Sequence, residues 1–274
     1  MKTVKSLLIK AFIVLFSSYV IICAGFYTVQ DTFIFKPTKL DKGYAVVYDF
    51  PFEERNFEVE EGIVLNSILA KADSAKGLIF FCHGNAGSVQ TDPARFEVFL
   101  DLGYDVIYPD YRGYGKSDGY PESDEQIVSD IDFIYQEMLK EYDEDDITIL
   151  GYSLGSGIAA LLAAEHNPKN VMIWTPYYSM VDMKNAIYPF LPTFLMNFPF
   201  RTDLAIPKID EPITIFYAEN DEVLPVDRSI KLQELLKEND EVVILKDQGH
   251  NKLYLNEELI SKLPEVLNKG GIGS

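Results

Sequence analysis

A serine stands between two glycines in the segment GYSLG, residues 151–155. A serine hydroxyl is a weak nucleophile until a base removes its proton, and it must stand clear of the fold to meet a carbonyl carbon. The segment follows a β-type run and opens an Ala- and Leu-rich helical pattern, so it predicts a sharp strand-to-helix turn that exposes Ser153. The alternative is a tight turn in which Ser153 only caps the helix.

A nucleophilic serine needs a base, and the sequence offers His83, His166 and His250. His166 lies at the far end of the same predicted helix, ~20 Å from the turn, which excludes it. His83 is embedded in HGNAG, where shaping the backbone is the better interpretation. His250, in KDQGHN after the last predicted strand, remains as the expected base.

The histidine in turn needs a carboxylate that holds its ring in one tautomer. The segment ITIFYAENDEVLP places Asp221 just past a predicted strand, with Glu219 and Glu222 as rivals. We prefer Asp221 because a shorter side chain holds its carboxylate at a more reproducible position relative to the histidine ring. For the oxyanion we expect two backbone N–H donors, from Leu154 after the nucleophile and from Asn85 in HGNAG.

Beyond residue 35, short β-branched runs alternate with helical stretches, which predicts an α/β fold with a mostly parallel, doubly wound sheet. A hairpin at residues 55–70 precedes strands expected at residues 77–82, 104–109, 146–150, 171–174, 213–218 and 241–246. Helices are expected at residues 93–102, 123–142, 154–166, 226–238 and 253–267. The loop DYRGYGKSDG joins the same rim, where we expect Asp110 and Arg112 to form an ion pair.

The N-terminal 30 residues are expected to lie outside the folded domain, which spans residues 31–270. Residues 7–27 form an apolar run of ~31 Å of helix, enough to cross a bilayer if Lys10 snorkels. We favour an uncleaved signal anchor, against a cleaved signal peptide or a buried core helix. Lys2, Lys5 and Lys10 favour a cytoplasmic N-terminus and an extracytoplasmic domain, although Lys36, Lys39 and Lys42 follow the run.

Composition limits the partners. A net charge of −19 repels phosphate backbones, so nucleic acid is excluded as a partner. Three scattered histidines offer no cluster of ligands, and we therefore expect neither a metal nor a cofactor. The two cysteines, Cys23 and Cys82, define no disulfide framework, and nothing in the composition sets the oligomeric state.

The segments FFCHGNAGS, DYRGYGKSDG, GYSLGSG, ENDEVLP and QGHN together resemble the motifs of the α/β-hydrolase superfamily, in particular its membrane-anchored serine hydrolases of the lysophospholipase/peptidase-like branch. The resemblance covers about residue 33 to the C-terminus. It implies a triad of Ser153, Asp221 and His250 and an oxyanion hole formed by Asn85 and Leu154. Glycine near the acid loop is common in that family, and this chain has YAEND there.

The resemblance also implies a small cap insertion at residues 176–210, which are rich in aromatic residues and methionine. Such a lid over a serine suits an apolar acyl group, so we expect a serine hydrolase acting on esters or thioesters that include lipid-derived ones. A peptidase that uses Glu219 and Glu222 to bind a substrate amine, and a non-catalytic membrane-tethered binding module, are the alternatives.

Overall fold

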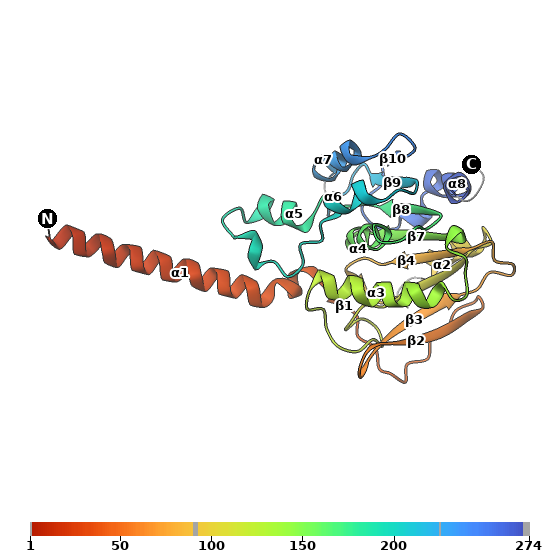
Figure 1. Cartoon of the computed structure of the whole chain (residues 1–274), viewed down its shortest axis with the longest axis horizontal. Helices are drawn as coiled ribbons and strands as arrows, with labels where there is room; N and C mark the ends of the chain where they lie inside the picture. Colours follow the sequence, from red (N-terminus) through yellow and green to blue (C-terminus); the bar gives the residue numbers. More distant parts are fainter. Residues whose placement is uncertain (1, 90–92, 225, 271–274) are drawn as a thin grey trace.

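One mostly parallel sheet organises the domain. A computed structural model describes residues 2–89, 93–224 and 226–270, and in this part of the chain eight strands run in the order β10-β9-β8-β7-β4-β6-β3-β2 (Figure 1). β3 is antiparallel to both of its neighbours, and the other pairings are parallel. The strands are β2 (Phe52–Glu60), β3 (Ile63–Ala70), β4 (Leu78–Cys82), β6 (Asp105–Pro109), β7 (Ile147–Tyr152), β8 (Asn170–Trp174), β9 (Ile213–Ala218) and β10 (Glu241–Leu245).

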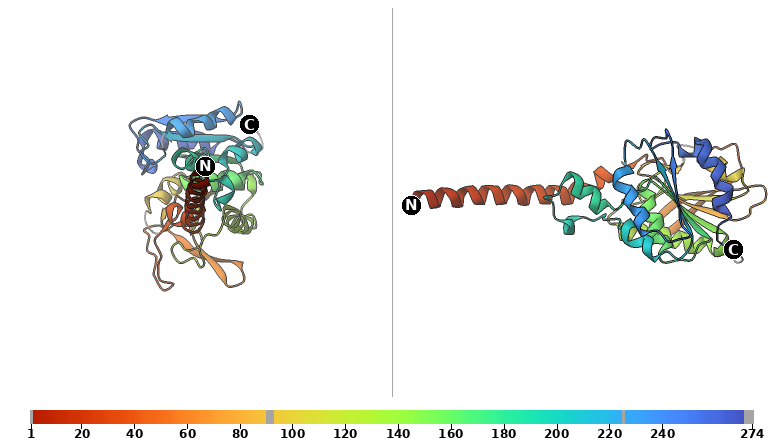
Figure 2. Two further views of the ribbon diagram at one scale, coloured as in Figure 1. Left: turned by 90° about the vertical axis from the view of Figure 1, so that its left-hand side faces the viewer. Right: turned by 90° about the horizontal axis from the view of Figure 1, so that it is seen from above.

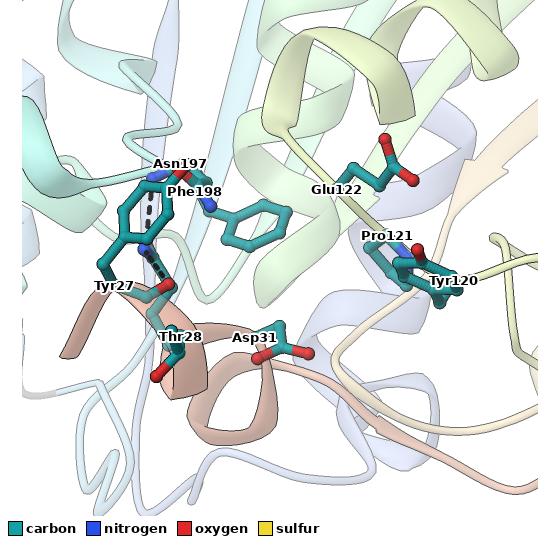
Figure 3. A pocket seen from close by; sticks show the side chains of 9 residues that line it. Tyr27, Thr28, Asp31, Tyr120, Pro121, Glu122, Asn197 and Phe198 are labelled. Atoms are coloured by element: carbon teal, nitrogen blue, oxygen red, sulfur yellow. Dashed lines mark hydrogen bonds between the residues drawn. The ribbon is translucent and has the colours of Figure 1, made fainter. Parts of the chain in front are cut away.

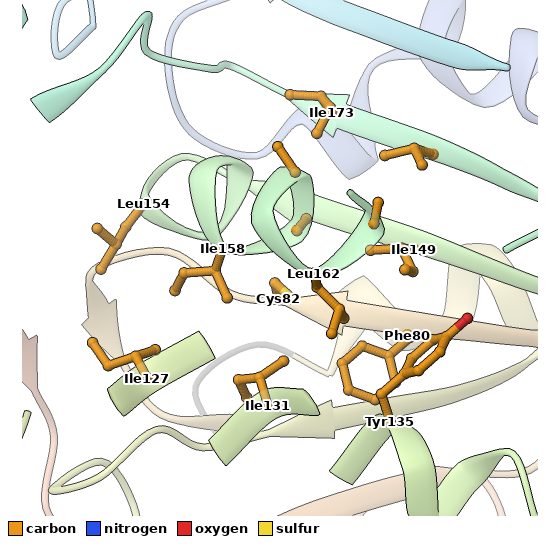
Figure 4. Close-up of a cluster of buried hydrophobic side chains, with 14 of the residues drawn as sticks. Phe80, Cys82, Ile127, Ile131, Tyr135, Ile149, Leu154, Ile158, Leu162 and Ile173 are labelled. Atoms are coloured by element: carbon orange, nitrogen blue, oxygen red, sulfur yellow. The ribbon is translucent and has the colours of Figure 1, made fainter. Parts of the chain in front are cut away.

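Helices cover both faces of the sheet, which is why its central strands are apolar along their whole length. α3 (Asp124–Met138) and α4 (Leu154–Ala163) pack on one face, where Ile131 and Leu162 meet Phe80 of β4 (Figure 4). α2 (Ala94–Leu100) and α8 (Glu257–Leu267) cover the other face. The expected doubly wound α/β fold is confirmed.

Two expected helices are shorter than the sequence pattern suggests. Residues 226–238 form α7 (Val226–Ser229) and a 3-10 helix, Ile230–Leu235. Ser229 and Leu232 are the residues of these two pieces that become buried, so little packing enforces a regular helix. Residues 253–267 are also divided, because Asn256 adopts an extended backbone and its side chain caps the amide of Leu259 at 3.0 Å.

The cap occupies the connection between β8 and β9. It contains α5 (Met180–Ile187), a 3-10 helix (Thr193–Leu195), α6 (Thr202–Ala205) and a second 3-10 helix (Ile206–Lys208). Its aromatic side chains divide into two groups: Phe198 and Phe200 are buried, whereas Phe190 and Phe194 are exposed. Part of the cap thus belongs to the core, and part faces outward.

A long helix, α1 (Lys2–Ile34), projects from the domain (Figures 1 and 2). It is long and apolar enough to cross a membrane, and none of its most apolar window is buried, which excludes the core-helix alternative. The chain then enters the domain through β1 (Lys36–Pro37), which pairs in parallel with β5 (Ala86–Gly87). The end of α1 therefore lies next to the loop that contains Asn85.

Candidate active site

Ser153 occupies a strained turn between β7 and α4. Its backbone has φ 53° and ψ −117°, a combination that is unfavourable for a residue with a side chain. The turn is held by its own amide, which donates to Trp174 O at 3.0 Å. A Cβ at Gly155 would lie 2.0 Å from Cys82 O, and one at Gly151 would lie 2.6 Å from Gly155 O, so both positions require glycine. This close packing explains the spacing of the glycines around the serine.

The structure brings together three residues that are far apart in the chain. His250 Nε2 lies 2.9 Å from Ser153 Oγ, and His250 Nδ1 lies 2.7 Å from Asp221 Oδ2. All three side chains are largely buried, so little water competes for these contacts. The arrangement can accept a proton from the serine and stabilise the imidazolium that results.

The loop after β9 fixes which carboxylate contacts the histidine. Asp221 Oδ1 accepts hydrogen bonds from the amides of Val223 (2.9 Å) and Leu224 (2.6 Å), leaving Oδ2 for His250. Glu222 instead accepts from His250 N at 3.1 Å, and Glu219 accepts from Asp247 N at 3.0 Å. Glu219 and Glu222 therefore stabilise the loop that carries His250, but they lie outside the relay formed by Ser153, His250 and Asp221.

The other two histidines lie elsewhere. His166 contacts Asp132 and Tyr135 beyond the end of α4. His83 is buried beneath the loop after β4, stacked on Tyr111, with Nδ1 2.7 Å from Gly84 O. Burial lowers the pKa of His83 to about 3, so its ring is neutral at physiological pH. A structural role fits this environment.

Leu154 and Asn85 provide two backbone amides near the relay. Leu154 begins α4, so its N–H has no intrahelical acceptor. The Asn85 peptide is held through its carbonyl, which accepts from Lys36 N at 2.8 Å and from Tyr114 Oη at 2.6 Å. Its side chain donates to Ile34 O at 3.1 Å. Within the described residues, neither the Asn85 nor the Leu154 N–H has an acceptor, which leaves both available to a ligand.

The predicted ion pair between Asp110 and Arg112 is wrong. Arg112 binds Asp130 of α3 with two hydrogen bonds of 2.7 and 2.9 Å and also reaches Glu60. Asp110 points inward and accepts from Val89 N at 2.8 Å. Because the two side chains leave the loop in different directions, each meets a partner that is distant in the sequence.

Other contacts of the site were not anticipated from the sequence. Tyr152, the residue before the nucleophile, donates its hydroxyl to His250 O at 3.1 Å. The sequence also did not predict the pairing of β1 with β5, because two-residue strands leave no recognisable pattern in the sequence. Among the described residues, no group of three or more His, Cys, Asp or Glu side chains could hold a metal ion.

Comparison with known proteins agrees with the fold. Residues 77–172 match the family described as the alpha/beta hydrolase fold. The chain is 26% identical over 234 residues to an uncharacterized protein of Acanthamoeba polyphaga mimivirus. This alignment covers 76% of this chain and 78% of that protein. It is 30% identical over 183 residues to the lysophosphatidylserine lipase ABHD12 of Danio rerio, a match of 59% of this chain and 48% of the lipase.

Among solved structures, an esterase of Pyrococcus furiosus superposes with a TM-score of 0.69 and 19% identity, over 85% of this chain and 96% of that one. The family match and the superposition therefore both show that the chain has the alpha/beta hydrolase fold. At the level of the family, a function like that of esterases and lipases is supported. The chain spans about half the length of the Danio rerio lipase, so the activity of that protein does not transfer directly.

Proposed function

We propose that the protein is a serine hydrolase that cleaves carboxylic esters or thioesters with an apolar acyl group. The observation that supports this most strongly is the relay of Ser153, His250 and Asp221, with contacts of 2.9 and 2.7 Å. The strained backbone of Ser153 adds to it, because strain persists where the surrounding structure enforces it and is concentrated at functional sites.

In the proposed reaction, Ser153 Oγ attacks the carbonyl carbon while its proton passes to His250 Nε2. Asp221 stabilises the imidazolium through Nδ1–H, and the N–H groups of Leu154 and Asn85 bind the oxyanion. Collapse of the tetrahedral intermediate expels the alkoxide or thiolate, which takes the proton from Nε2. Water then attacks the acyl-enzyme, His250 accepts its proton and returns it to Ser153 Oγ, and the carboxylic acid leaves.

Labelling of the full chain with a fluorophosphonate tests the nucleophile. Wild type is expected to label and Ser153→Ala is expected not to, and a panel of p-nitrophenyl esters and thioesters of increasing chain length then defines the acyl preference. Absence of labelling in a folded wild type would favour the alternative, a non-catalytic binding module. A strict optimum at acetyl would contradict the apolar acyl group.

The peptidase alternative depends on free carboxylates to bind a substrate amine. Glu219 and Glu222 both accept backbone hydrogen bonds from the loop that carries His250. This engagement favours ester substrates over an amine-anchored peptide. Aminoacyl-amide substrates test the point, and turnover of these faster than of esters would reverse the preference.

We also propose that α1 anchors the protein in a membrane as a single-pass helix, with the domain on the extracytoplasmic side. The support is the exposed apolar surface of α1 and the lysines that precede its apolar run. N-terminal sequencing of the mature chain distinguishes an anchor from a cleaved signal peptide. Protease accessibility in sealed vesicles tests the orientation.

A further inference from the structure

The last turns of α1 are packed against the cap. Gln30 is buried, with its Nε2 donating to Leu195 O at 2.9 Å and its Oε1 accepting from Asn197 N at 2.7 Å. Nearer the N-terminus, Tyr19 Oη donates to Phe190 O at 2.9 Å. The cap therefore extends along α1 from residue 30 back to residue 19, and α5 lies near the C-terminal half of this helix in Figure 1 and in the right-hand view of Figure 2.

This contact places the outer part of the cap beside the apolar run of α1. Residues 11–30 contain no charged side chain, which corresponds to ~30 Å of helix, and Tyr19 lies within this run. We define the cap tip as residues 187–195. Its exposed apolar side chains include Ile187 at 62%, Phe190 at 54% and Phe194 at 84% exposure. Such a patch is unfavourable in water and favourable against lipid.

An apolar cavity of about 230 Å³ lies between α1 and α5. This volume is below the ~300 Å³ typical of sites for drug-sized ligands, and it suits a single alkyl chain. Methionine side chains, which adapt to flexible ligands, contribute to it. We call this cavity the acyl groove; it is lined by Phe26, Gln30, Phe33 and Ile34 of α1 and by Met180, Met183, Lys184, Ile187, Tyr188 and Met196 of the cap.

The one charged residue in the acyl groove does not make it polar. Lys184 donates from Nζ to Leu191 O at 2.7 Å, so its ammonium group is satisfied by the cap itself. Its methylene stem remains to contribute apolar surface. Burial lowers the pKa of Lys184, which agrees with these apolar surroundings.

Each wall of the acyl groove ends close to a residue that contacts the candidate oxyanion hole. The α1 wall ends at Ile34, whose carbonyl accepts the side-chain hydrogen bond of Asn85. The cap wall begins at Met180, three residues after Tyr177, whose hydroxyl donates to Leu154 O at 3.1 Å. The end of the α1 wall therefore contacts one of the residues proposed to bind the oxyanion, and the cap wall begins three residues after a residue that contacts the other.

A larger cavity of about 510 Å³, also lined by Gln30, is chemically unsuited to an alkyl chain (Figure 3). Its walls include the carboxylates of Asp31 and Glu122 and the amide of Asn197. Transferring an alkyl chain from lipid into such polar surroundings gains nothing. The apolar cavity is therefore the better acyl site of the two.

We propose that the acyl groove holds the acyl chain of a membrane lipid ester, which enters sideways from the leaflet between α1 and the cap. This inference rests on the proposed ester hydrolase function. It makes α1 a wall of the substrate site in addition to an anchor. The cap tip lies in the leaflet and keeps the entrance to the groove in contact with lipid.

Two tryptophan substitutions test the groove in the full chain, in liposomes. Met183→Trp fills the middle of the groove, and Ile187→Trp, at a position already 62% exposed, narrows its entrance without disturbing the core. For each we expect the ratio of dodecanoyl to butyryl ester hydrolysis to fall at least fivefold. Ile260→Trp, on α8, is the matched control and should keep the wild-type ratio. An unchanged ratio in Ile187→Trp overturns the inference.

A binding measurement separates this inference from the proposed function. Ser153→Ala in liposomes is mixed with a lysophospholipid whose acyl chain carries a terminal diazirine, and the crosslinked peptides are mapped. We expect crosslinks in residues 180–188 of the cap that disappear when Met183→Trp is added. Crosslinks confined to exposed positions of α1 overturn the groove. Failure of the wild type to hydrolyse any ester, with these cap crosslinks present, overturns only the hydrolase.

Discussion

The side-chain amide of Asn85 donates a hydrogen bond to the carbonyl oxygen of Ile34 over 3.1 Å, and Ile34 is the last residue of α1. The loop proposed to bind the oxyanion is therefore held by the N-terminal helix. The amide of Lys36 adds a second tie at 2.8 Å, to the Asn85 carbonyl. A displacement of the C-terminal end of α1 should therefore also displace the loop that contains Asn85.

Asn85→Ala removes the tie to Ile34 and leaves the backbone N–H in place. One neutral hydrogen bond is worth about 1 kcal/mol, so we expect kcat to fall roughly 3- to 10-fold with little change in KM. Steady-state hydrolysis of a short ester measures this. Asn167→Ala, at an exposed position beyond α4, is the control and should keep wild-type kcat. A drop of a thousandfold would mean that the side chain itself contacts the reacting group.

Substitutions in the acid loop distinguish Asp221 from its neighbour. Asp221→Asn should lower kcat by about 10³- to 10⁴-fold, because the amide can no longer stabilise the imidazolium or select its tautomer. Glu222→Gln keeps an oxygen that can accept from His250 N and should stay within about threefold of wild type. Equal losses in both variants would show that the carboxylates share the role.

The sequence predicted the parts of the site that depend on local geometry. Gly151 and Gly155 indicate the turn because no other residue fits against Gly155 O and Cys82 O. His250 is then the expected base, since the length of the helix places His166 too far from Ser153. The strands were predictable because burial on both faces leaves continuous apolar runs. None of these inferences requires knowledge of contacts between distant segments.

The features that escaped prediction depend on long-range contacts. Arg112 and Asp110 are two residues apart, yet the nearest carboxylate in space to Arg112 is Asp130. The β1–β5 pairing involves two residues on each side, one of them Pro37, and short strands of this kind carry no hydrophobic pattern.

The Arg112–Asp130 pair gives a prediction about stability. Both side chains are less than a tenth exposed, so Arg112→Met leaves a buried carboxylate without its cation. We expect the free energy of unfolding to fall by about 3–5 kcal/mol, and the double variant Arg112→Met/Asp130→Leu to recover much of it. Arg55→Met breaks a more exposed pair and should cost less than about 1 kcal/mol. Urea unfolding of the four proteins makes the comparison, and similar losses in Arg112→Met and Arg55→Met would contradict it.

Asp110 should make the stability of the domain depend on pH. Burial raises the pKa of its carboxyl to about 8, against an ordinary value near ~4. At a pH between these two pKa values, Asp110 holds a proton in the folded state and has released it in the unfolded state. The stabilising contribution is therefore complete below the unfolded pKa and is lost as the pH rises through the folded one. His83 acts in the opposite direction, because its lowered pKa destabilises the fold as the pH falls below ~6.5.

Asp110→Asn cannot ionise and keeps an oxygen that can accept from Val89 N. We expect the difference in Tm, variant minus wild type, to increase steadily from pH 5 to pH 8.5, since only the wild type must hold a proton in the fold. His83 Nε2 lies 3.8 Å from Asp110 Oδ1, and the contribution of His83 cancels in the difference as long as Asp110 is neutral in the fold. Asp118→Asn is the control: a hydrogen bond to Lys42 lowers the pKa of Asp118, so it is ionised throughout this range and its difference should be flat. A flat difference for Asp110→Asn as well would mean that Asp110 is ionised in the folded protein, and that Asp110 is not what ties the stability of the domain to pH.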